Sequence, residues 1–361
     1  MIHIKLYFEY TLYVNYIKDV IIMSKKNIPN VKKISIIISI LSIFFLIFTL
    51  SAFGNYINKF NTVNINKEKV IPKYMNSQVD NSDPVQPQGR MQNKYIKNIA
   101  LLGIDSGDDN VGRSDCILIA TIDTEHNKIK LSSIIRDSYV TIPSKNKKDK
   151  INHAYAFGGP ELTLETLNLN FNLNISQFIS VNFASFPKII DKIGGITIDI
   201  KEDELKYINN YINDLNAHNN TSSSDITQTG PQIVDGTQAL AYARIRYTDG
   251  GDFERSHRQR IVVDEVFKKL KELPILKYPD ALDSLLPLVD TNLSSSEILS
   301  LCLDLTSFDN FNIIEERFPK DEDAEGKSIN GIYYYVFDED AEGKSINGIY
   351  YYVIVASSSK T

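Results

Sequence analysis

The hydrophobic residues divide the chain into three parts. Residues 34–53 form an uninterrupted apolar run without a charged side chain, and the first charge after it is Lys59. At about 1.5 Å per residue, a helix of this length spans about 30 Å, the thickness of the hydrocarbon layer of a membrane. Residues 54–97 are polar, and from residue 98 onwards short apolar runs alternate with polar turns. This pattern predicts one transmembrane helix, a spacer and a folded domain.

The part beyond residue 98 alternates between β-rich runs and stretches with helical periodicity. Strands are expected at 99–103, 116–122, 128–135, 178–181 and 196–200. Helices are expected near 185–193, 235–243, 253–272, 282–289 and 295–305, the last with serine capping candidates before Glu297. Gly158 and Gly159 should end one short helix before Pro160 begins another, because proline suits the first turn of a helix. Strands that alternate with helices indicate a layered α/β domain.

The charges around the apolar run predict its orientation. Four lysines lie in residues 25–33, and no basic cluster follows residues 34–53 closely. By the positive-inside rule, residues 1–33 would be cytoplasmic and the rest of the chain extracellular, as in a single-pass type II membrane protein. A cleaved signal peptide is the alternative, but its apolar core would be unusually long.

Four further segments carry organisational signals. Residues 1–22 are too charged to span a membrane, so we favour Met23 as the true start. Residues 54–97 are expected to be an extracellular stem. Residues 216–229 form a low-complexity polar loop, which is either a mobile lid or, as we favour, a tolerated insertion. Residues 321–336 and 338–353 are identical (DEDAEGKSINGIYYYV), which we interpret as one native strand-turn element and one duplicate.

Composition narrows the function. The net charge of −6 argues against general nucleic-acid binding, which needs a broad basic face. Cys116 and Cys302 are the only cysteines, and both are expected to be buried hydrophobic residues. No spacing of cysteine and histidine suggests zinc. Any recognition of phosphate should therefore be confined to a small site.

Arginine is rare in this chain and concentrated in a few motifs. There are nine arginines against thirty lysines, and seven of the nine lie in the motifs GRSD, IIRD, ARIR and FERSHRQR. The planar guanidinium binds phosphate or carboxylate oxygens in pairs, which a lysine ammonium cannot do. Aspartates accompany these arginines. Each motif alone is most often structural, but together they predict a site for a phosphate-rich ligand and a divalent cation.

The spacing of these residues suggests how they are arranged. If the ARIR segment is a strand, Arg244 and Arg246 project from one face about 7 Å apart, which suits a pyrophosphate. On a helix, Arg255 and Gln259 share a face, with Arg258 close to it. The remaining arginine of this motif would point elsewhere, and we expect Arg260 to be a solvated surface residue.

Two carboxylates and one histidine complete the set of candidates. Asp105 and Asp115 flank one loop and could hold Mg²⁺, which takes one or two carboxylates plus ligand phosphates and waters. His153 fits a helix-start or core histidine better than a catalytic base. No nucleophile elbow, phosphate-binding loop or dinucleotide fingerprint is present in the sequence.

Seven motifs, in order, resemble the LytR–CpsA–Psr family of Gram-positive cell-wall enzymes. They are LLGIDS (101–106), GRSDCILIATID (112–123), SSIIRDSYVTIP (132–143), KINHAYAFGGPE (150–161), VNFASFPKIIDKIGGITIDI (181–200), VDGTQALAYARIRY (234–247) and GDFERSHRQR (251–260). The resemblance is close over residues 98–270 and implies a catalytic domain at 98–361. It also implies a three-layer α-β-α fold in which a central mixed sheet lies between helices, with a hydrophobic tunnel for a lipid.

The resemblance implies a phosphotransferase on the outer side of the cell membrane. Such enzymes move an anionic glycopolymer, for example a teichoic acid or a capsule, from a polyprenyl-pyrophosphate carrier to peptidoglycan, and the product is a phosphodiester. A pyrophosphatase that hydrolyses the lipid carrier is one alternative. A non-catalytic wall-binding or regulatory module, such as a transcription attenuator, is another.

Roles follow from the resemblance position by position. The carboxylates linked to Mg²⁺ (or Mn²⁺) are Asp105 and Asp115. The arginines that grip the pyrophosphate are Arg113, Arg136, Arg244 and Arg246. The remaining site residues are Asp252, Arg255 and Gln259. Asp137 is expected to orient Arg136, and Asp105 or Asp115 could accept the proton of the acceptor hydroxyl. The chain departs from the family pattern at Glu254, where glycine is common, and in its C-terminal duplication.

Overall fold

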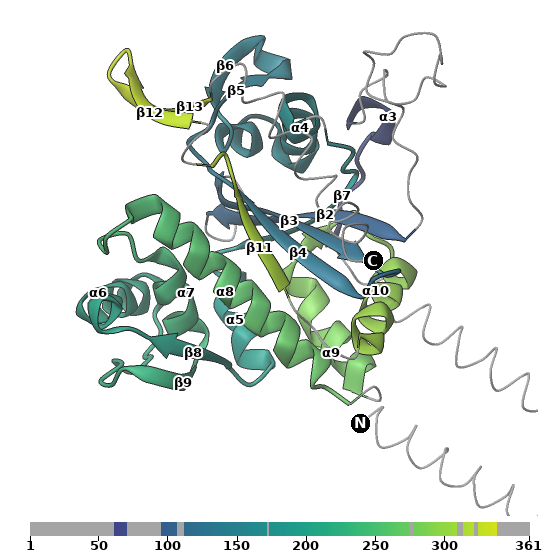
Figure 1. Ribbon diagram of the computed structural model, residues 1–361. Helices are drawn as coiled ribbons and strands as arrows, with labels where there is room; N and C mark the ends of the chain where they lie inside the picture. Colours follow the sequence, from purple (N-terminus) through teal and green to yellow (C-terminus); the bar gives the residue numbers. More distant parts are fainter. Residues whose placement is uncertain are drawn as a thin grey trace, which may run out of the picture. The chain divides into compact units, whose positions relative to one another are not determined.

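The computed structural model describes residues 61–70, 95–106, 112–171, 173–274, 277–308, 313–320 and 324–337 (Figure 1). The chain divides into two units, Met1–Lys59 and Phe60–Thr361, and every described residue lies in the second. Within the described residues, no helix has both the length and the apolarity to cross a membrane. The predicted transmembrane segment 34–53 and the region around Met23 lie outside the described residues.

A mixed sheet lies at the centre of the folded unit. Its seven strands, as far as the structure describes the chain, run in the order β1 (Asn61–Thr62), β10 (Asp290–Thr291), β7 (Gln177–Asn182), β2 (Ile96–Asp105), β3 (Arg113–Asp123), β4 (Lys128–Ile134) and β11 (Ile313–Phe318). β2 pairs with β7 in parallel and with β3 antiparallel. β3 and β4 are antiparallel, and β4 and β11 are parallel. The predicted mixed sheet is therefore confirmed.

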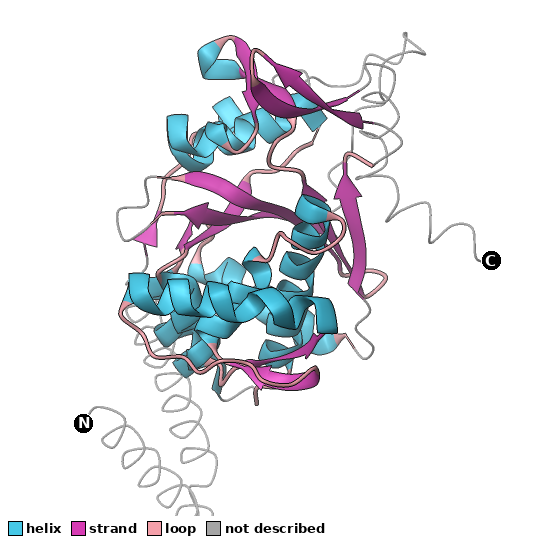
Figure 2. Cartoon of the chain, turned by 90° about the vertical axis from the view of Figure 1, so that its left-hand side faces the viewer, coloured by secondary structure: helices cyan, strands magenta, loops and turns pink. Residues whose placement is uncertain are grey.

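Helices cover both faces of this sheet. In Figures 1 and 2, α4 (His153–Phe171) lies on one side, and α5 (Ser185–Lys192), α8 (Gly251–Lys271) and α9 (Tyr278–Leu285) lie on the other. The remaining helices are α3 (Lys67–Val70), α6 (Glu202–Asn219), α7 (Gly236–Arg244) and α10 (Ser295–Ser307), with short 3-10 turns at Pro143–Lys145 and Leu286–Leu288.

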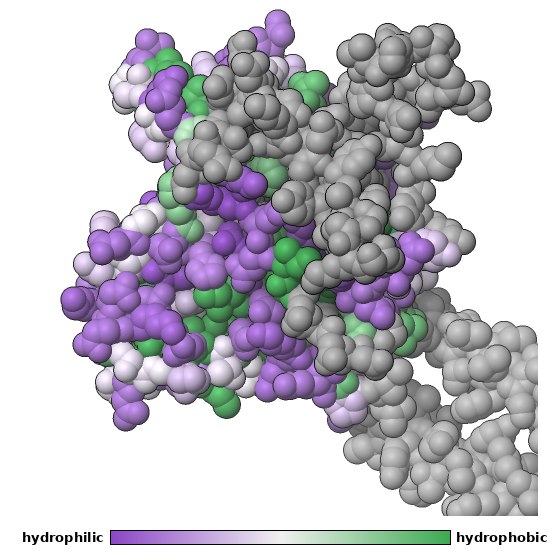
Figure 3. Space-filling view, in the orientation of Figure 1, coloured by the Kyte–Doolittle hydropathy of each residue, from purple (hydrophilic) through white to green (hydrophobic). Residues whose placement is uncertain are grey.

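Three two-stranded sheets surround the centre. They are β5 (Tyr139–Ile142) with β6 (Lys147–Lys150), β8 (Ile196–Ile200) with β9 (Gly230–Val234), and β12 (Ala324–Ile329) with β13 (Ile332–Phe337). The run predicted at 196–200 is thus a strand, but it belongs to a peripheral pair and not to the central sheet. Around α6, β8 and β9 the visible surface is mostly hydrophilic (Figure 3).

Alternation along β2 separates two cores. Leu102 and Ile104 point into one core together with Leu164 and Leu167 of α4. Ile99 points to the opposite face, where α10 and the 3-10 turn before it pack. Successive side chains of a strand project to opposite faces, so an apolar strand can serve helices on both sides. A third core joins α5–α8 with β8 and β9.

Several local predictions are confirmed. Helix α4 is interrupted at Gly158 and Gly159, the latter with a φ of 62° that glycine adopts without steric cost. Ser294 caps α10 through a hydrogen bond from the amide of Glu297. Cys116 and Cys302, predicted to be buried, are free thiols of intermediate exposure, and partial burial raises the pKa of their thiols to about 12 and about 11, respectively.

Part of the predicted stem belongs to the folded domain. Within 54–97, strand β1 pairs with β10, and Val70 is fully buried in the core beneath α4. The side chain of Asn168 donates to the carbonyl of Val70 at 3.0 Å. Residues 61–70 are therefore held by the domain and do not act as a spacer.

The polar loop at 216–229 is not a free lid. Its first residues end helix α6, and the rest is held by asparagine side chains of that helix. Asn209 exchanges two hydrogen bonds of 2.9 Å with the backbone of Ile226, and Asn216 exchanges two with the backbone of Ser223. Of the two identical C-terminal copies, the first forms β12 and β13, whereas the second, 338–353, lies outside the described residues.

Candidate active site

A β-bulge at the start of β3 places Asp115 in the site. Gly103 pairs with Cys116 and Ile104 pairs with Ser114, so Asp115 has no partner across the β2–β3 pair. An extra residue of this kind bends the strand and redirects its side chain. Gly103 allows the close approach of the strands, because a Cβ at this position would lie 2.8 Å from the Cβ of Cys116. The glycine of the LLGID motif therefore allows the close strand pairing next to the bulge that places Asp115 in the site.

Arg136 lies at the centre of a charged cluster. Its Nη1 is 2.5 Å from Oδ2 of Asp115, and its Nε is 3.4 Å from Oδ2 of Asp252 and 3.7 Å from Oδ2 of Asp137. Nδ2 of Asn152 donates to the other Asp115 oxygen at 2.9 Å. Burial by itself raises the pKa of Asp115, but the charge of Arg136 and the hydrogen bond from Asn152 outweigh it, and the pKa lies below its ordinary value.

Helix α8 adds a second arginine to the cluster. Nη2 of Arg255 donates to Oδ2 of Asp252 at 3.0 Å, and only 3% of Arg255 is exposed. Arg246 approaches from the segment after α7, with Nη2 3.7 Å from Oδ2 of Asp115 and Nε 4.0 Å from Oδ1 of Asp252. We call Arg136, Arg246 and Arg255, with Asp115 and Asp252, the arginine cluster.

The arginine cluster holds more positive charge than its carboxylates balance. Burial, and then the charges of Arg136 and Arg246, lower the pKa of Arg255 to about 10 although Asp252 acts in the opposite direction. Nε of Arg136 and Nε of Arg255 are buried and have no hydrogen-bond partner in the described part of the chain. Buried donors and crowded guanidinium groups are what an anionic ligand would satisfy.

Asp105, the second predicted metal ligand, lies beside Arg113. Asp105 ends β2 opposite Arg113, which begins β3, and Nη2 of Arg113 is 3.9 Å from Oδ2 of Asp105. Both side chains are largely accessible, with 51% of Arg113 and 38% of Asp105 exposed. The charge of Arg113 also lowers the pKa of Asp115. Among the described residues, no group of three or more metal-binding side chains is found.

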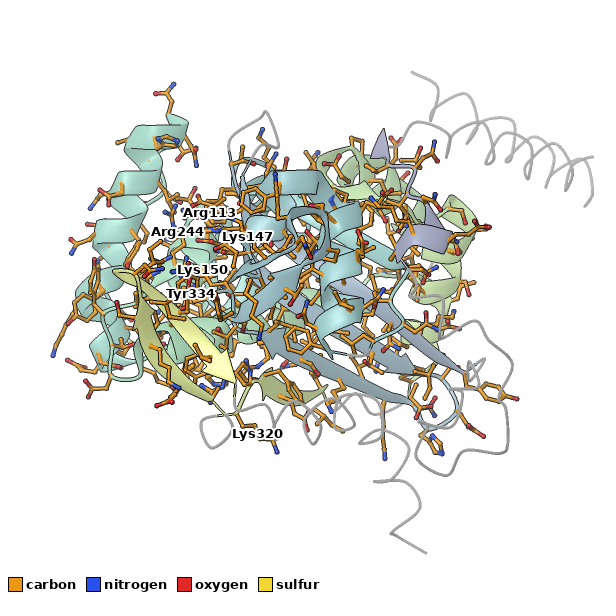
Figure 4. The ribbon with its side chains drawn as sticks, turned by 90° about the horizontal axis from the view of Figure 1, so that it is seen from above. Arg113, Lys147, Lys150, Arg244, Lys320 and Tyr334 are labelled. Carbon is orange, nitrogen blue, oxygen red and sulfur yellow. The ribbon has the colours of Figure 1, made fainter. Side chains whose placement is uncertain are left out.

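The prediction for the ARIR segment is wrong in its local structure. Arg244 is the last residue of α7 and Ile245 is its C-terminal cap, so the two arginines do not share the face of a strand. The Arg244 guanidinium lies 4.9 Å from the centre of the Phe183 ring, a cation–π contact. Figure 4 shows it on the same side of the molecule as Arg113.

Two arginines of α8 serve the fold and not the arginine cluster. Arg258 is buried and donates to Glu204 at 2.7 Å, to Thr248 at 2.6 Å and to the carbonyl of Ile245 at 3.2 Å. Arg260, predicted to be solvated, is 8% exposed.

Three further predicted residues, Arg260, Gln259 and His153, can be placed in the structure. Arg260 donates to Glu315 at 2.8 Å and to Ser133 at 2.7 Å, which ties α8 to the central sheet. Gln259 lies one turn after Arg255 on the same helical face. His153 begins α4, where its Nδ1 is 3.1 Å from Asp149. This position agrees with a helix-start histidine.

The departure at Glu254 lies away from the arginine cluster. Glu254 and Arg258 are four residues apart and share a helical face. Its charge contributes to the raised pKa of Tyr242, after burial and the charge of Glu204. The additional carboxylate therefore acts on the structural side of α8.

Two residues of the site were not singled out from the sequence. Asn152 holds Asp115, and its backbone amide and carbonyl bond to the carbonyl of Arg136 and the amide of Ser114, at 3.2 Å each. Nζ of Lys150 lies 2.8 Å from Oδ1 of Asp137. Both belong to the KINHAY motif, whose polar residues between apolar ones were the available signal.

Binding of inorganic pyrophosphate is expected to raise the melting temperature. A ligand present at about 100 times its Kd adds about 2.7 kcal/mol of stability, and the loss of a buried cation should abolish much of that gain. We expect Arg255→Met to melt close to the wild type without ligand, because Asp252 keeps Arg136 and Arg246 as neighbours. Differential scanning fluorimetry with and without pyrophosphate measures both effects, and an equal rise in both proteins would contradict the assignment.

The fold and the site define a class of protein: an α/β domain in which arginines and carboxylates gather at the ends of central strands of the sheet, an arrangement suited to a phosphate-rich anion. The chain belongs to the LytR_cpsA_psr family, whose model matches residues 56–349.

Known relatives and solved structures agree with this assignment. The chain is 34% identical over 225 residues to the polyisoprenyl-teichoic acid–peptidoglycan teichoic acid transferase TagU of Enterococcus faecalis, covering 61% of this chain and 69% of that protein. It is 35% identical over 246 residues to TagU of Bacillus cereus, covering 66% and 72%. A structure of TagT bound to LIIa-WTA superposes with a TM-score of 0.57 at 26% identity, covering 71% and 90%.

Proposed function

We propose that this protein transfers an anionic glycopolymer from a polyprenyl-pyrophosphate carrier to peptidoglycan, forming a phosphodiester. The arginine cluster is the observation that carries the proposal. Arg136, Arg246 and Arg255 surround one small region, and the buried Nε atoms of Arg136 and Arg255 lack hydrogen-bond partners in the described part of the chain. Family membership and the names of the transferase relatives point to the same reaction.

The cluster can stabilise the charge that the reaction moves. When the acceptor hydroxyl attacks the phosphorus next to the sugar, negative charge grows on the oxygens of the departing lipid phosphate. Guanidinium groups held in place beforehand stabilise this charge without having to reorganise. Asp115 and Asp252 orient the guanidinium groups. Asp137 contacts Arg136 and also pairs with Lys150.

Asp105 and Asp115 are the residues that would hold Mg²⁺ or Mn²⁺. Each oxygen of Asp115 accepts one hydrogen bond, Oδ2 from Arg136 and Oδ1 from Asn152, which leaves acceptor capacity on both. Two carboxylates together with pyrophosphate oxygens and waters form an adequate set of ligands. The metal would neutralise pyrophosphate charge.

The finer architecture belongs to the same proposal. We expect residues 34–53 to anchor the chain as a type II membrane protein, so that the domain meets a lipid-linked substrate on the outer side of the membrane. The core that joins α5–α8 with β8 and β9 is apolar. Two of its helices, α7 and α8, carry Arg244 and Arg255. It is the region where a tunnel for the polyprenyl chain would run.

A product assay tests this function. The full-length protein in detergent is incubated with a synthetic polyprenyl-pyrophosphate-linked saccharide and peptidoglycan oligomers, and the products are read by mass spectrometry. We expect a phosphodiester-linked adduct that disappears with EDTA and returns with added Mg²⁺. Release of polyprenyl phosphate without an adduct would favour the pyrophosphatase, and ligand binding without any turnover would favour the wall-binding or regulatory module.

The metal is tested separately from turnover. Titration calorimetry should detect Mg²⁺ binding in the presence of pyrophosphate, and Asp105→Asn should weaken this binding about tenfold or more, because a neutral amide replaces a charged ligand. Asp199→Asn, on the exposed part of β8, is the matched control. Equal Mg²⁺ affinity in all three proteins would remove Asp105 from the metal site.

A further inference from the structure

The β5–β6 hairpin begins and ends next to residues of the candidate active site. Its two strands span 139–150 and follow Arg136 and precede Asn152. The backbone amide of Asn152 donates to the carbonyl of Arg136 at 3.2 Å, and the amide of Ile151 donates to the carbonyl of Ser138 at 3.0 Å. The base of the hairpin is therefore built by the same residues that hold Asp115.

This hairpin is the densest basic segment of the described domain. Four lysines (Lys145, Lys147, Lys148 and Lys150) accompany a single aspartate, Asp149, in a chain whose net charge is −6. Three of these lysines are exposed, and 58% of the side chain of Lys147 is accessible although it lies 3.6 Å from Asp149. We call residues 139–150 the lysine hairpin.

The lysines lie over aromatic rings on the two faces of the hairpin, because successive residues of β6 project to opposite sides. Nζ of Lys145 is 4.9 Å and Nζ of Lys147 is 6.0 Å from the centre of the Phe157 ring, which is 40% exposed. On the other face, Lys148 lies over Tyr139 and Lys150 lies over Tyr334, at 5.9 Å and 5.7 Å. Charged groups interleaved with apolar faces suit a ligand in which phosphates alternate with sugars or polyols.

Lys150 links the lysine hairpin to the arginine cluster. It pairs with Asp137, which in turn holds Arg136. In Figure 4, seen from above, Lys147, Lys150 and Tyr334 project over the same region as Arg113 and Arg244, whereas Lys320 projects apart from them; in Figure 1, β5 and β6 lie well above α7. A polymer whose terminal pyrophosphate occupies the arginine cluster would thus meet the lysine hairpin with its following units.

We propose that the lysine hairpin is an extended subsite for the repeating phosphates of the glycopolymer, so that the enzyme selects phosphate-repeat polymers over neutral polysaccharides. The inference rests on the proposed function, because it places the polymer relative to the arginine cluster. Repeated charge contacts add affinity that grows with polymer length and falls with salt. Neutral glycans would gain none of it.

The first test is binding of a free polymer without a lipid carrier. The probe is a fluorescent glycerol phosphate oligomer, and the full-length protein is compared with the variant Lys145→Gln, Lys147→Gln, Lys148→Gln. At about 0.05 M salt we expect binding to weaken about tenfold. We also expect the slope of log Kd against log salt to fall by about 2, since each phosphate contact contributes about 0.7.

A matched variant controls for overall charge. Lys188, Lys192 and Lys206 are exposed on α5 and α6, outside the hairpin, and their replacement by glutamine removes the same number of charges. This variant should bind the oligomer like the wild type. Equal weakening in both variants, or in neither, would overturn the proposal. A neutral dextran oligomer of similar length should not distinguish the wild type from either variant.

The binding test can succeed or fail independently of the transferase assay, because it needs neither lipid carrier nor peptidoglycan. Anionic lipid head groups carry the same phosphate chemistry, so co-sedimentation with phosphatidylglycerol vesicles forms a separate arm. If the hairpin variant loses vesicle binding but keeps oligomer binding, the lysine hairpin contacts the membrane surface and the proposal is wrong. Loss of oligomer binding without loss of vesicle binding supports it.

Discussion

Replacing Arg136 with alanine is expected to lower the rate of glycopolymer transfer about 100-fold to 1000-fold, which corresponds to about 3 kcal/mol or more of transition-state stabilisation. We expect a loss of this size because Arg136 contacts three carboxylates, with Asp115 at 2.5 Å, Asp252 at 3.4 Å and Asp137 at 3.7 Å. Its removal takes away one guanidinium and releases Asp115 and Asp252, the two carboxylates that orient Arg246 and Arg255. The product assay with the lipid-linked saccharide measures the loss.

Lysine at this position should rescue little of the activity. A lysine ammonium supplies the charge, but it cannot bond two oxygens in one plane as a guanidinium does. Arg136→Lys is therefore expected to remain within about tenfold of the alanine variant. A lysine variant with nearly normal turnover would show that charge alone is required, and the pyrophosphate geometry assigned to the arginine cluster would be wrong.

Loss of folding must be separated from loss of chemistry at this position. Asp115 keeps Asn152 at 2.9 Å and Arg246 at 3.7 Å when Arg136 is removed, but the carboxylate stays buried. Adding Asp115→Asn to Arg136→Ala should recover the melting temperature, because the buried charge disappears. The double variant should remain inactive. Recovery of activity together with stability would mean that Arg136 acts only on the fold.

Replacing Arg258 with methionine is expected to lower the free energy of unfolding by about 3 to 5 kcal/mol. The side chain is fully used: it bonds Glu204, Thr248 and the carbonyl of Ile245, and only 2% of it is exposed. Without it, the carboxylate of Glu204 is buried and uncompensated. At about 2 to 4 °C per kcal/mol for a domain of this size, the melting temperature should fall by about 10 °C.

A second substitution distinguishes the ion pair from general packing at Arg258. Adding Glu204→Leu removes the stranded carboxylate, and apolar replacements of buried ion pairs are often neutral or stabilising. The double variant should therefore recover most of the lost stability in urea unfolding. Activity measured below the melting temperature should change little in the double variant. A loss of transfer with normal stability would return Arg258 to the candidate active site.

Stability and function thus fall on different faces of helix α8. Asp252 and Arg255 face the arginine cluster, where Arg255 is crowded by like charges and its pKa is lowered to about 10. Arg258 and Arg260 face the core and the sheet, where their carboxylate partners are close. An arginine with satisfied donors stabilises the domain, whereas one with free buried donors is available for a ligand.

Local patterns in the sequence predicted most of the elements. The apolar runs gave β2, β3, β4 and β7 as strands, because their residues alternate between two buried faces. The glycine pair at 158–159 and the Ser294 cap act through the backbone of their neighbours alone, so they could be read directly. The scarcity of arginine against lysine also identified Arg136, Arg246 and Arg255 before any geometry was known.

Contacts between distant segments decided the rest. Whether Arg258 and Arg260 are solvated depends on Glu204 and Glu315, which lie 54 and 55 residues away in the chain. The end of α7 at Arg244, and not the spacing of the ARIR segment, determines how its two arginines diverge. Periodicity within one segment carries no information about which carboxylate will face it.

The sequence by itself determined the residue types of the site, the strands and helices with strong local patterns, and the family. Only the tertiary structure decided which arginines meet at Asp115, that residues 61–70 join the domain, and that a lysine-rich hairpin leaves the site between Arg136 and Asn152. The physical reason is that secondary structure follows from neighbours along the chain, whereas burial and charge pairing depend on partners that folding brings together.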